Sequence, residues 1–302
     1  MSKNTNGQLS LPIDSESLSI EPLENLDELY FGADGFMFPE WKELVWKKPY
    51  DKLELYHHGL IEYSRHPCLQ TIAIPPKKYP SPPERDLQCY THQLPDRFPA
   101  FALVHPMMTY PRASAAHPIV PEDEGKSPHH NSHFLDPEYF MGTIYPPFKK
   151  FFLNHLQGFI FEFPEHMTPS IMPPSLFSEK LGNFISNIDD EVTIYVSLPH
   201  KDYFREEYLN LLSKTSLLHA LNLNPAMPTP SAQRKNIPAQ QNWVLLWQPT
   251  QDKEKGEHKQ IHKLLQQRKG ETCYIIAKNS LNYPAPKAIA TLAATLGHNF
   301  KV

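Results

Sequence analysis

The stretch 29-LYFGADGFMFPEW-41 decides the fold. Residues 29–31 form a short apolar run that is typical of a buried strand, and Gly32 and Gly35 then free the backbone to turn sharply. Asp34 is left exposed at the carboxyl end of this strand. Helical spacing of apolar residues follows from about residue 51, so the stretch predicts one strand, loop and helix unit.

The same unit recurs along the chain. Further short apolar runs end at prolines or polar residues, and most precede a segment with helical periodicity. Strands that are apolar on both faces and alternate with helices indicate a parallel sheet, so we predict an α/β fold of the (β/α)8 TIM-barrel type. The sixth unit is expected to be irregular, since residues 224–240 are too rich in proline for a normal helix. The seven later strands are predicted at 69–74, 100–104, 158–163, 192–198, 217–221, 242–247 and 272–277.

The chain is predicted to form one barrel domain with two additions. Residues 1–25 are polar and read as a flexible N-terminal arm, and residues 26–302 form the barrel. A long insertion at about 107–133, after the third strand, resembles a lid or an irregular flap.

Composition limits the partners. The formal charge of -4 provides no positive field for nucleic acid or anionic lipid. The three cysteines fit neither a disulfide framework nor a thiolate metal site. No signal-peptide pattern or membrane-spanning run of about 18 apolar residues occurs. We therefore expect a soluble cytoplasmic protein with a possible small-molecule ligand and no nucleic-acid or membrane partner. The sequence does not indicate whether the protein uses a cofactor.

Six motifs follow one another along the chain. They are the first glycine loop with Trp41, Ile72 to Tyr79, Gln93 to Phe101, Phe161 to Pro164, Met227-Pro228 with Gln233, and Lys278 to Pro286. In this order they resemble the motifs of the domain-of-unknown-function 72 family, also called YecE-like proteins. The resemblance runs from about Tyr30 to Leu296 and implies a TIM barrel without an established activity.

The departures from the family pattern fall on charged positions. Ala73 and Pro75 stand where the family has Glu and Asn, and residues 196–199 replace a Val-Glu-Leu-Arg type motif. This chain is therefore expected to have lost most polar groups of the family's barrel mouth. The leading hypothesis is a diverged ligand-binding or non-catalytic member. The alternative is a metal-independent or metal-dependent hydrolase or lyase of a small polar or phosphorylated substrate.

Candidate catalytic residues lie where barrel strands end, which is where TIM barrels place their active sites. Glu162 could act as an acid/base group with His105 or Lys278, because a carboxylate among apolar neighbours titrates closer to neutral pH. The alternative is that Glu162 and Lys278 form a purely structural pair.

Candidate ligand-binding residues are polar or aromatic groups near the same strand ends. Asp34 could instead cap its own loop, and some of the aromatic residues must belong to the core. The candidates are Asp34, Trp41, Tyr79, Gln233, Trp247 and Asn279.

One histidine cluster has a spacing that could bind zinc. His129, His130 and His133 lie in HHNSH, where imidazoles four residues apart can share a helix face. They follow a proline in the insertion and have no carboxylate at ligand spacing, so a solvated loop is favoured and no metal site is predicted.

Overall fold

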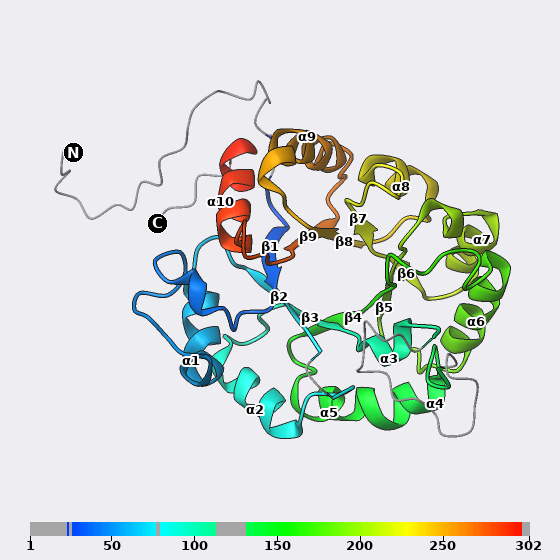
Figure 1. The fold of residues 1–302 in the computed structure, drawn as a ribbon, viewed down its shortest axis with the longest axis horizontal. Coiled ribbons are helices and arrows are strands. Elements are labelled where there is room, and N and C mark those ends of the chain that lie inside the picture. The colour runs from blue at the N-terminus through cyan, green and yellow to red at the C-terminus, as the bar shows by residue number, and fades with distance from the viewer. Residues whose placement is uncertain (1–22, 24–25, 77–78, 113–130, 298–302) are drawn as a thin grey trace.

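The computed structural model describes residues 23, 26–76, 79–112 and 131–297. Within these residues nine parallel strands lie at the centre of a ring of helices (Figure 1). Each strand pairs in parallel with its neighbours, as the alternation of strands and helices predicts. The strands are β1 (Leu29–Asp34), β2 (Thr71–Ile74), β3 (Ala100–Leu103), β4 (Leu156–Glu162), β5 (Ile194–Ser197), β6 (Leu218–His219), β7 (Leu221–Asn222), β8 (Asn242–Trp247) and β9 (Thr272–Ala277).

The strand order closes the sheet into a barrel. It runs β6-β5-β4-β3-β2-β1-β9-β8-β7, so the two ends of the order are consecutive in the chain. β6 pairs with β5 and β7 pairs with β8, and only Ala220 separates β6 from β7. They are two pieces of the predicted sixth strand, each paired with a different neighbour. The predicted (β/α)8 TIM barrel is therefore confirmed, with its sixth strand split.

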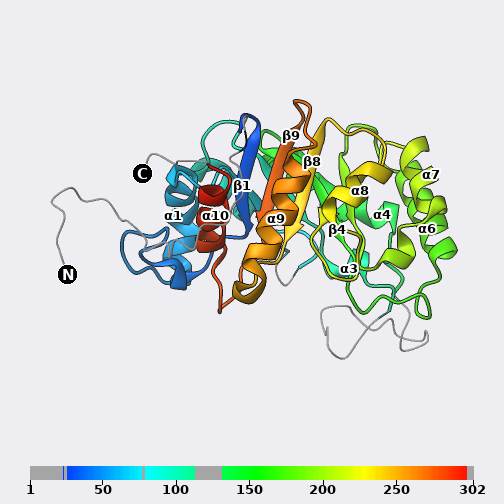
Figure 2. The same cartoon turned by 90° about the horizontal axis from the view of Figure 1, so that it is seen from above.

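The helices surround the strands and cover their outer faces (Figure 2). Short turns of other helix types occur at Pro39–Trp41, Phe140–Ile144, Lys201–Tyr203 and Gln251–Lys253. The α-helices are α1 (Lys52–Arg65), α2 (Glu84–Gln93), α3 (Pro106–Thr109), α4 (Pro137–Tyr139), α5 (Tyr145–Phe151), α6 (Pro174–Ser186), α7 (Glu206–Lys214), α8 (Pro230–Asn236), α9 (Glu254–Leu265) and α10 (Ala285–Thr295).

The irregular sixth unit does contain a short helix, α8, of seven residues. Thr229 caps its N-terminus by accepting a hydrogen bond from the Ala232 backbone, and Pro230 occupies the first turn, where no backbone N–H donor is needed. The prolines thus shorten the helix of this unit rather than remove it.

Two apolar cores follow from the alternation of side chains along the strands. The larger core lies between the barrel and its helices. The smaller core fills the barrel and is built from Ala73, Phe101, Ile160, Tyr195, Ala220, Val244, Leu246, Tyr274 and Ile276.

The first strand makes an unusually close contact with the second. A Cβ atom on Gly32 would lie 2.0 Å from the backbone oxygen of Thr71, so only glycine fits here. Beside it, the buried hydroxyl of Tyr63 accepts a hydrogen bond from the Ala33 N–H and donates one to the Thr71 oxygen. Helix α1 is thereby fixed to both strands.

Most of the predicted arm (1–25) and the centre of the predicted insertion (113–130) fall outside the described residues. In the described part of the chain, no helix has both the length and the apolar character needed to cross a membrane.

Candidate functional site

A layer of polar side chains lies above the apolar core of the barrel, at the carboxyl ends of the strands. Each member stands two positions beyond an inward-facing residue of its strand, for example Glu162 after Ile160 and Lys278 after Ile276. The carboxyl ends of barrel strands are where TIM barrels bind ligands. This layer includes Asp34, Glu162, Ser197, Asn222, Gln248 and Lys278.

Glu162 and Lys278 form an ion pair across the barrel mouth. Glu162 ends β4 and Lys278 follows β9, and the ammonium of Lys278 donates a hydrogen bond to Oε1 of Glu162. The side chains are 36% and 27% exposed, so the pair keeps contact with solvent. Burial raises the pKa of the neighbouring Tyr110, and the charge of Glu162 raises it further.

Asp34 adds a third ionisable group beside this pair. Its Oδ1 accepts a hydrogen bond of 2.6 Å from the backbone N–H of Asn279. Burial raises the pKa of Asp34 from 3.8 to about 7, against the opposing effects of the Asn279 hydrogen bond and the Lys278 charge. The Glu162 charge raises this pKa further. The barrel mouth therefore holds three interacting ionisable side chains.

A cavity of about 720 Å³ opens between the ends of β4, β5, β7 and β8 and the first turns of α8 and α9. This volume falls within the range of small-molecule pockets. The charged and polar part of its lining includes Glu162, Lys278, Thr250, Lys253 and Glu257. The apolar part of the lining comes mainly from Phe163, Leu198, Leu223, Met227, Pro228 and Leu246.

Asn222 is held rigidly at the edge of this cavity. Its Nδ2 donates to the Leu198 oxygen at 2.8 Å and to the Ser197 hydroxyl at 3.1 Å. Gln233 fixes its backbone, because Oε1 of Gln233 accepts from the Asn222 N–H and Nε2 donates to the Asn222 oxygen. Nε2 of His219 donates to the same Oε1.

His219 is neutral, because burial lowers its pKa to about 4. Since its Nε2 must carry the hydrogen that Gln233 accepts, Nδ1 accepts a hydrogen bond from the Tyr208 hydroxyl. These buried hydrogen bonds, from Tyr208 through His219 to Gln233, allow the Gln233 carboxamide only one orientation.

His105 does not join the cavity, contrary to its predicted role with Glu162. It is 1% exposed and does not contribute to the cavity lining. Its Nδ1 accepts the Met107 N–H and caps α3, while burial lowers its pKa to about 4. The imidazole is therefore neutral at physiological pH. Its Nε2 has no partner within the described residues.

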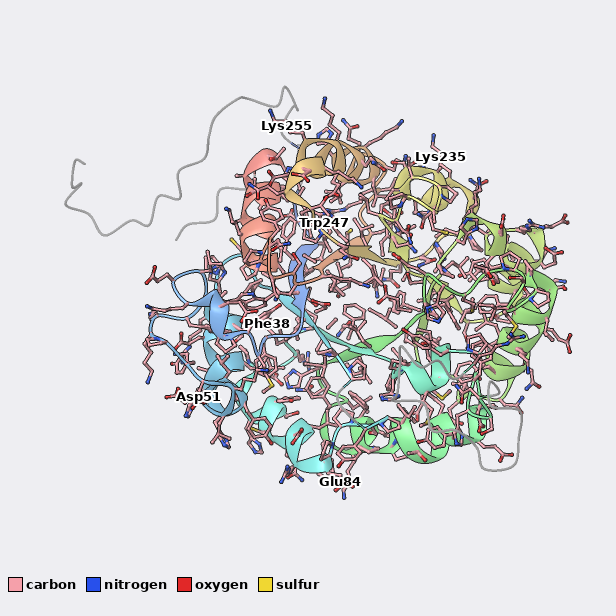
Figure 3. The ribbon with its side chains drawn as sticks, viewed as in Figure 1. Phe38, Asp51, Glu84, Lys235, Trp247 and Lys255 are labelled. Atoms are coloured by element: carbon pink, nitrogen blue, oxygen red, sulfur yellow. The ribbon has the colours of Figure 1, made fainter. Side chains whose placement is uncertain are left out.

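The predicted tryptophans are core residues rather than cavity walls. Trp41 is fully buried, and its indole donates to Oδ1 of Asn279 at 2.9 Å. Trp247 is also fully buried, and its indole donates to Glu257 at 2.8 Å. Figure 3 shows Trp247 between the strands and α9. The Trp247 side chain faces outward from β8, toward the helices. The next residue, Gln248, therefore takes the inward position at the end of that strand.

The remaining predicted ligand residues also lie outside the cavity. Gln233 is fully buried and positions Asn222, whereas Tyr79 is 57% exposed. Asn279 links Asp34, Trp41 and the first turn of α10, since its Oδ1 also accepts from the Ala285 N–H. Of the predicted residues, Glu162 and Lys278 line the cavity and Asp34 interacts with both.

The described residues contain no group of three or more His, Cys, Asp or Glu side chains that could hold a metal ion. Nδ1 of His133 lies 3.3 Å from Asp136, and its ring packs on Tyr139. His129 and His130 lie outside the described residues.

Sequence reasoning missed the polar groups of the fifth and sixth strands. Ser197 enters the predicted pattern only as the replacement for a charged residue, and Asn222 lies outside the predicted site. The signal was present, because both stand at inward positions, two residues after Tyr195 and Ala220.

Comparison with known proteins agrees with this architecture. A DUF72 protein from Thermotoga maritima superimposes with a TM-score of 0.57 at 14% identity, covering 89% of this chain and 97% of the other. One from Enterococcus faecalis gives a TM-score of 0.54 at 11% identity with the same coverage. A search of curated proteins finds no match. The sequence model of the family described as "Protein of unknown function DUF72" matches residues 30–302, and the chain therefore belongs to the DUF72 family.

Proposed function

We propose that this protein binds a small polar organic molecule in the cavity at the carboxyl end of its barrel. The observation that carries the proposal is the cavity of about 720 Å³, which opens where TIM barrels bind ligands. A few fixed polar groups beside apolar surface are the usual composition of a small-molecule site. Here the polar groups are Glu162, Lys278, Ser197 and Asn222.

The charge of the cavity disfavours a phosphorylated ligand. Four acidic residues line it and only two basic ones, and the ammonium of Lys278 is already paired with Glu162. Phosphate sites usually offer arginine, lysine or free backbone N–H groups. The supported class is therefore neutral or cationic.

A thermal-shift screen of metabolites tests the proposal with a matched pair of variants. Gly256 lines the cavity in α9, and a Cβ there would meet nothing within 4 Å, so Gly256→Phe should obstruct the cavity without a backbone clash. Gly142→Phe is the control, because Gly142 also has open space around it and lies away from the cavity.

We expect at least one compound to stabilise the wild type and Gly142→Phe but not Gly256→Phe. A ligand at 100 times its dissociation constant adds about 2.7 kcal/mol of stability. A broad screen in which every hit stabilises Gly256→Phe equally would refute binding in this cavity, and a screen without hits would favour a scaffold role.

A second candidate is proton-transfer catalysis of the hydrolase or lyase type at the same site. It is favoured by the pKa of Asp34 near 7, next to the Glu162–Lys278 pair that lines the cavity. Mass spectrometry after incubation with each screening hit would detect conversion. If both variants, Glu162→Gln and Lys278→Met, still convert the compound as fast as the wild type does, this candidate is refuted.

A cytoplasmic location without nucleic-acid partners remains part of the proposal. It is supported by the free cysteines Cys68, Cys89 and Cys273 and by the negative net charge.

A further inference from the structure

Lys278 offers the cavity a primary amine that a ligand can reach. It stands two positions beyond the inward-facing Ile276, directly after β9, and its side chain is 27% exposed. Among the described residues that line the cavity there is no cysteine or histidine. Lysine amines, once deprotonated, are therefore the strongest nucleophiles of the lining, since hydroxyl groups such as that of Ser197 are weak nucleophiles without a strong base.

Glu162 lies where it can take up and return the protons of this amine. Its Oε1 accepts a hydrogen bond from the Lys278 ammonium, and its side chain is 36% exposed and lines the same cavity. A proton that passes along this hydrogen bond leaves a neutral amine beside a carboxylic acid. The ion pair thus contains both a nucleophile and the base that can deprotonate it.

The pairing also decides which kind of ligand Lys278 can serve. Its ammonium is already neutralised by Glu162, so it has little attraction left for an anion. A carbonyl compound is different, because an amine that condenses with it becomes an iminium and keeps its positive charge. Glu162 then stays paired, whereas acylation of the amine would remove the positive charge and leave the carboxylate without its partner.

We propose that Lys278 forms an iminium with an uncharged aldehyde or ketone bound in the cavity, and that Glu162 transfers the protons of this step. This inference rests on the proposed ligand-binding function and names the ligand class.

The step needs no oxidant or reductant. Glu162 takes a proton from the Lys278 ammonium, and the freed electron pair on Nζ attacks the carbonyl carbon while the carbonyl oxygen receives the proton from Glu162. Nζ then gives a second proton to Glu162, which passes it to the new hydroxyl group. The carbon–oxygen bond breaks, water leaves, and the electron pair on Nζ forms the C=N bond. The carboxylate of Glu162 is regenerated beside the iminium.

Reductive trapping with cyclohexanecarbaldehyde and sodium cyanoborohydride at pH 7 tests the proposal, because the hydride converts an iminium into a stable secondary amine. Peptide mapping by mass spectrometry then gives the labelling rate of each lysine. Lys149 is the internal control, since its ammonium also donates to a carboxylate, that of Glu191, but this pair does not line the cavity.

We expect Lys278 to be labelled at least about tenfold faster than Lys149, because only the Lys278 pair can act on an aldehyde held in the cavity. Exposure alone predicts the opposite order, since the side chain of Lys149 is 50% exposed and that of Lys278 only 27%. A purely structural pair would therefore leave Lys278 the slower of the two.

Three variants connect the labelling to the cavity and to Glu162. Gly256→Phe should slow the labelling of Lys278 severalfold and leave Lys149 unchanged, whereas Gly142→Phe should change neither. Glu162→Gln keeps an oxygen that can accept the Lys278 hydrogen bond but cannot take up its proton, so it should slow the labelling of Lys278 by about tenfold or more.

The inference is overturned if Lys278 is labelled no faster than Lys149, or if Gly256→Phe labels Lys278 as fast as the wild type does. An unchanged rate in Glu162→Gln overturns the proton transfer assigned to Glu162. Each of these results leaves the proposed function standing, provided that the metabolite screen still finds ligands that Gly256→Phe excludes.

Discussion

The raised pKa of Asp34 makes a quantitative prediction about stability. The carboxyl group binds its proton more tightly in the folded protein, where its pKa is about 7, than in the unfolded chain, where it is near 3.8. Between these two pH values the folded state holds more protons, so the free energy of unfolding contributed by Asp34 falls as pH rises. One pH unit is worth about 1.4 kcal/mol, so the ionised carboxylate costs about 4 kcal/mol at pH 8.

Asp34→Asn should remove this cost. The amide keeps an oxygen that can accept the Asn279 N–H, and it carries no charge at any pH. We expect the variant to be more stable than the wild type by about 2–4 kcal/mol at pH 8, and this advantage to be smaller by about 2.5 kcal/mol at pH 5. The upper value corresponds to the full cost of ionisation.

Urea unfolding at both pH values, with wild type and variant side by side, measures the difference. Comparison at the same pH is necessary, because His105, His219 and His258 have pKa values lowered to about 4 by burial. These histidines lower the stability of the wild type as pH falls from about 6.5 to 4. Asp34 has the opposite effect, because its contribution to stability increases as pH falls. Asp252→Asn is the control, since it removes an exposed carboxylate and should change stability by less than about 0.5 kcal/mol. An Asp34→Asn effect that is equal at pH 5 and pH 8, or destabilising at pH 8, would refute the reasoning.

Three further substitutions test the framework of the site by chemical denaturation. Gln233→Leu breaks four buried hydrogen bonds and should cost about 3 kcal/mol or more, and a loss below about 1 kcal/mol would contradict the proposed positioning of Asn222. Gly32→Ala forces a Cβ to 2.0 Å from the Thr71 oxygen and should cost more than about 3 kcal/mol of stability. Its control, Gly256→Ala, should be neutral or stabilising by up to about 1 kcal/mol. Equal effects of the two substitutions would argue against the close contact of β1 and β2. Asp51→Ala removes the capping box of α1 and should cost about 1 kcal/mol, and an unchanged midpoint would contradict that role.

Much of the fold could be predicted because its strands are short and end at clear signals. The last two predicted strands match β8 and β9 residue for residue, since each is a run of buried residues with turns on both sides. The break between β6 and β7 could not be predicted, because it depends on which neighbour each half pairs with. Helix α8 was missed although Thr229-Pro230 is a favourable helix start, because the many prolines around it outweighed that signal.

The candidate site could be predicted in part, and the differences have two physical origins. Glu162 and Lys278 were identified from their places at strand ends, and the structure joins them across the barrel. The aromatic ring of Trp247 suggests a pocket wall, but this residue occupies the outward position of β8 and packs toward α9. Counting inward and outward positions along each strand would have selected Gln248, Ser197 and Asn222 instead. The burial of His105 and its use as a helix cap depend on tertiary packing that no local pattern contains.

The most direct test of the account is a crystal structure of the protein with a ligand taken from the screen. We predict electron density for the ligand between the ends of β4, β5, β7 and β8, within reach of Glu162, Lys278 and Asn222. Ligand density on another surface, with this cavity holding only solvent, would contradict it.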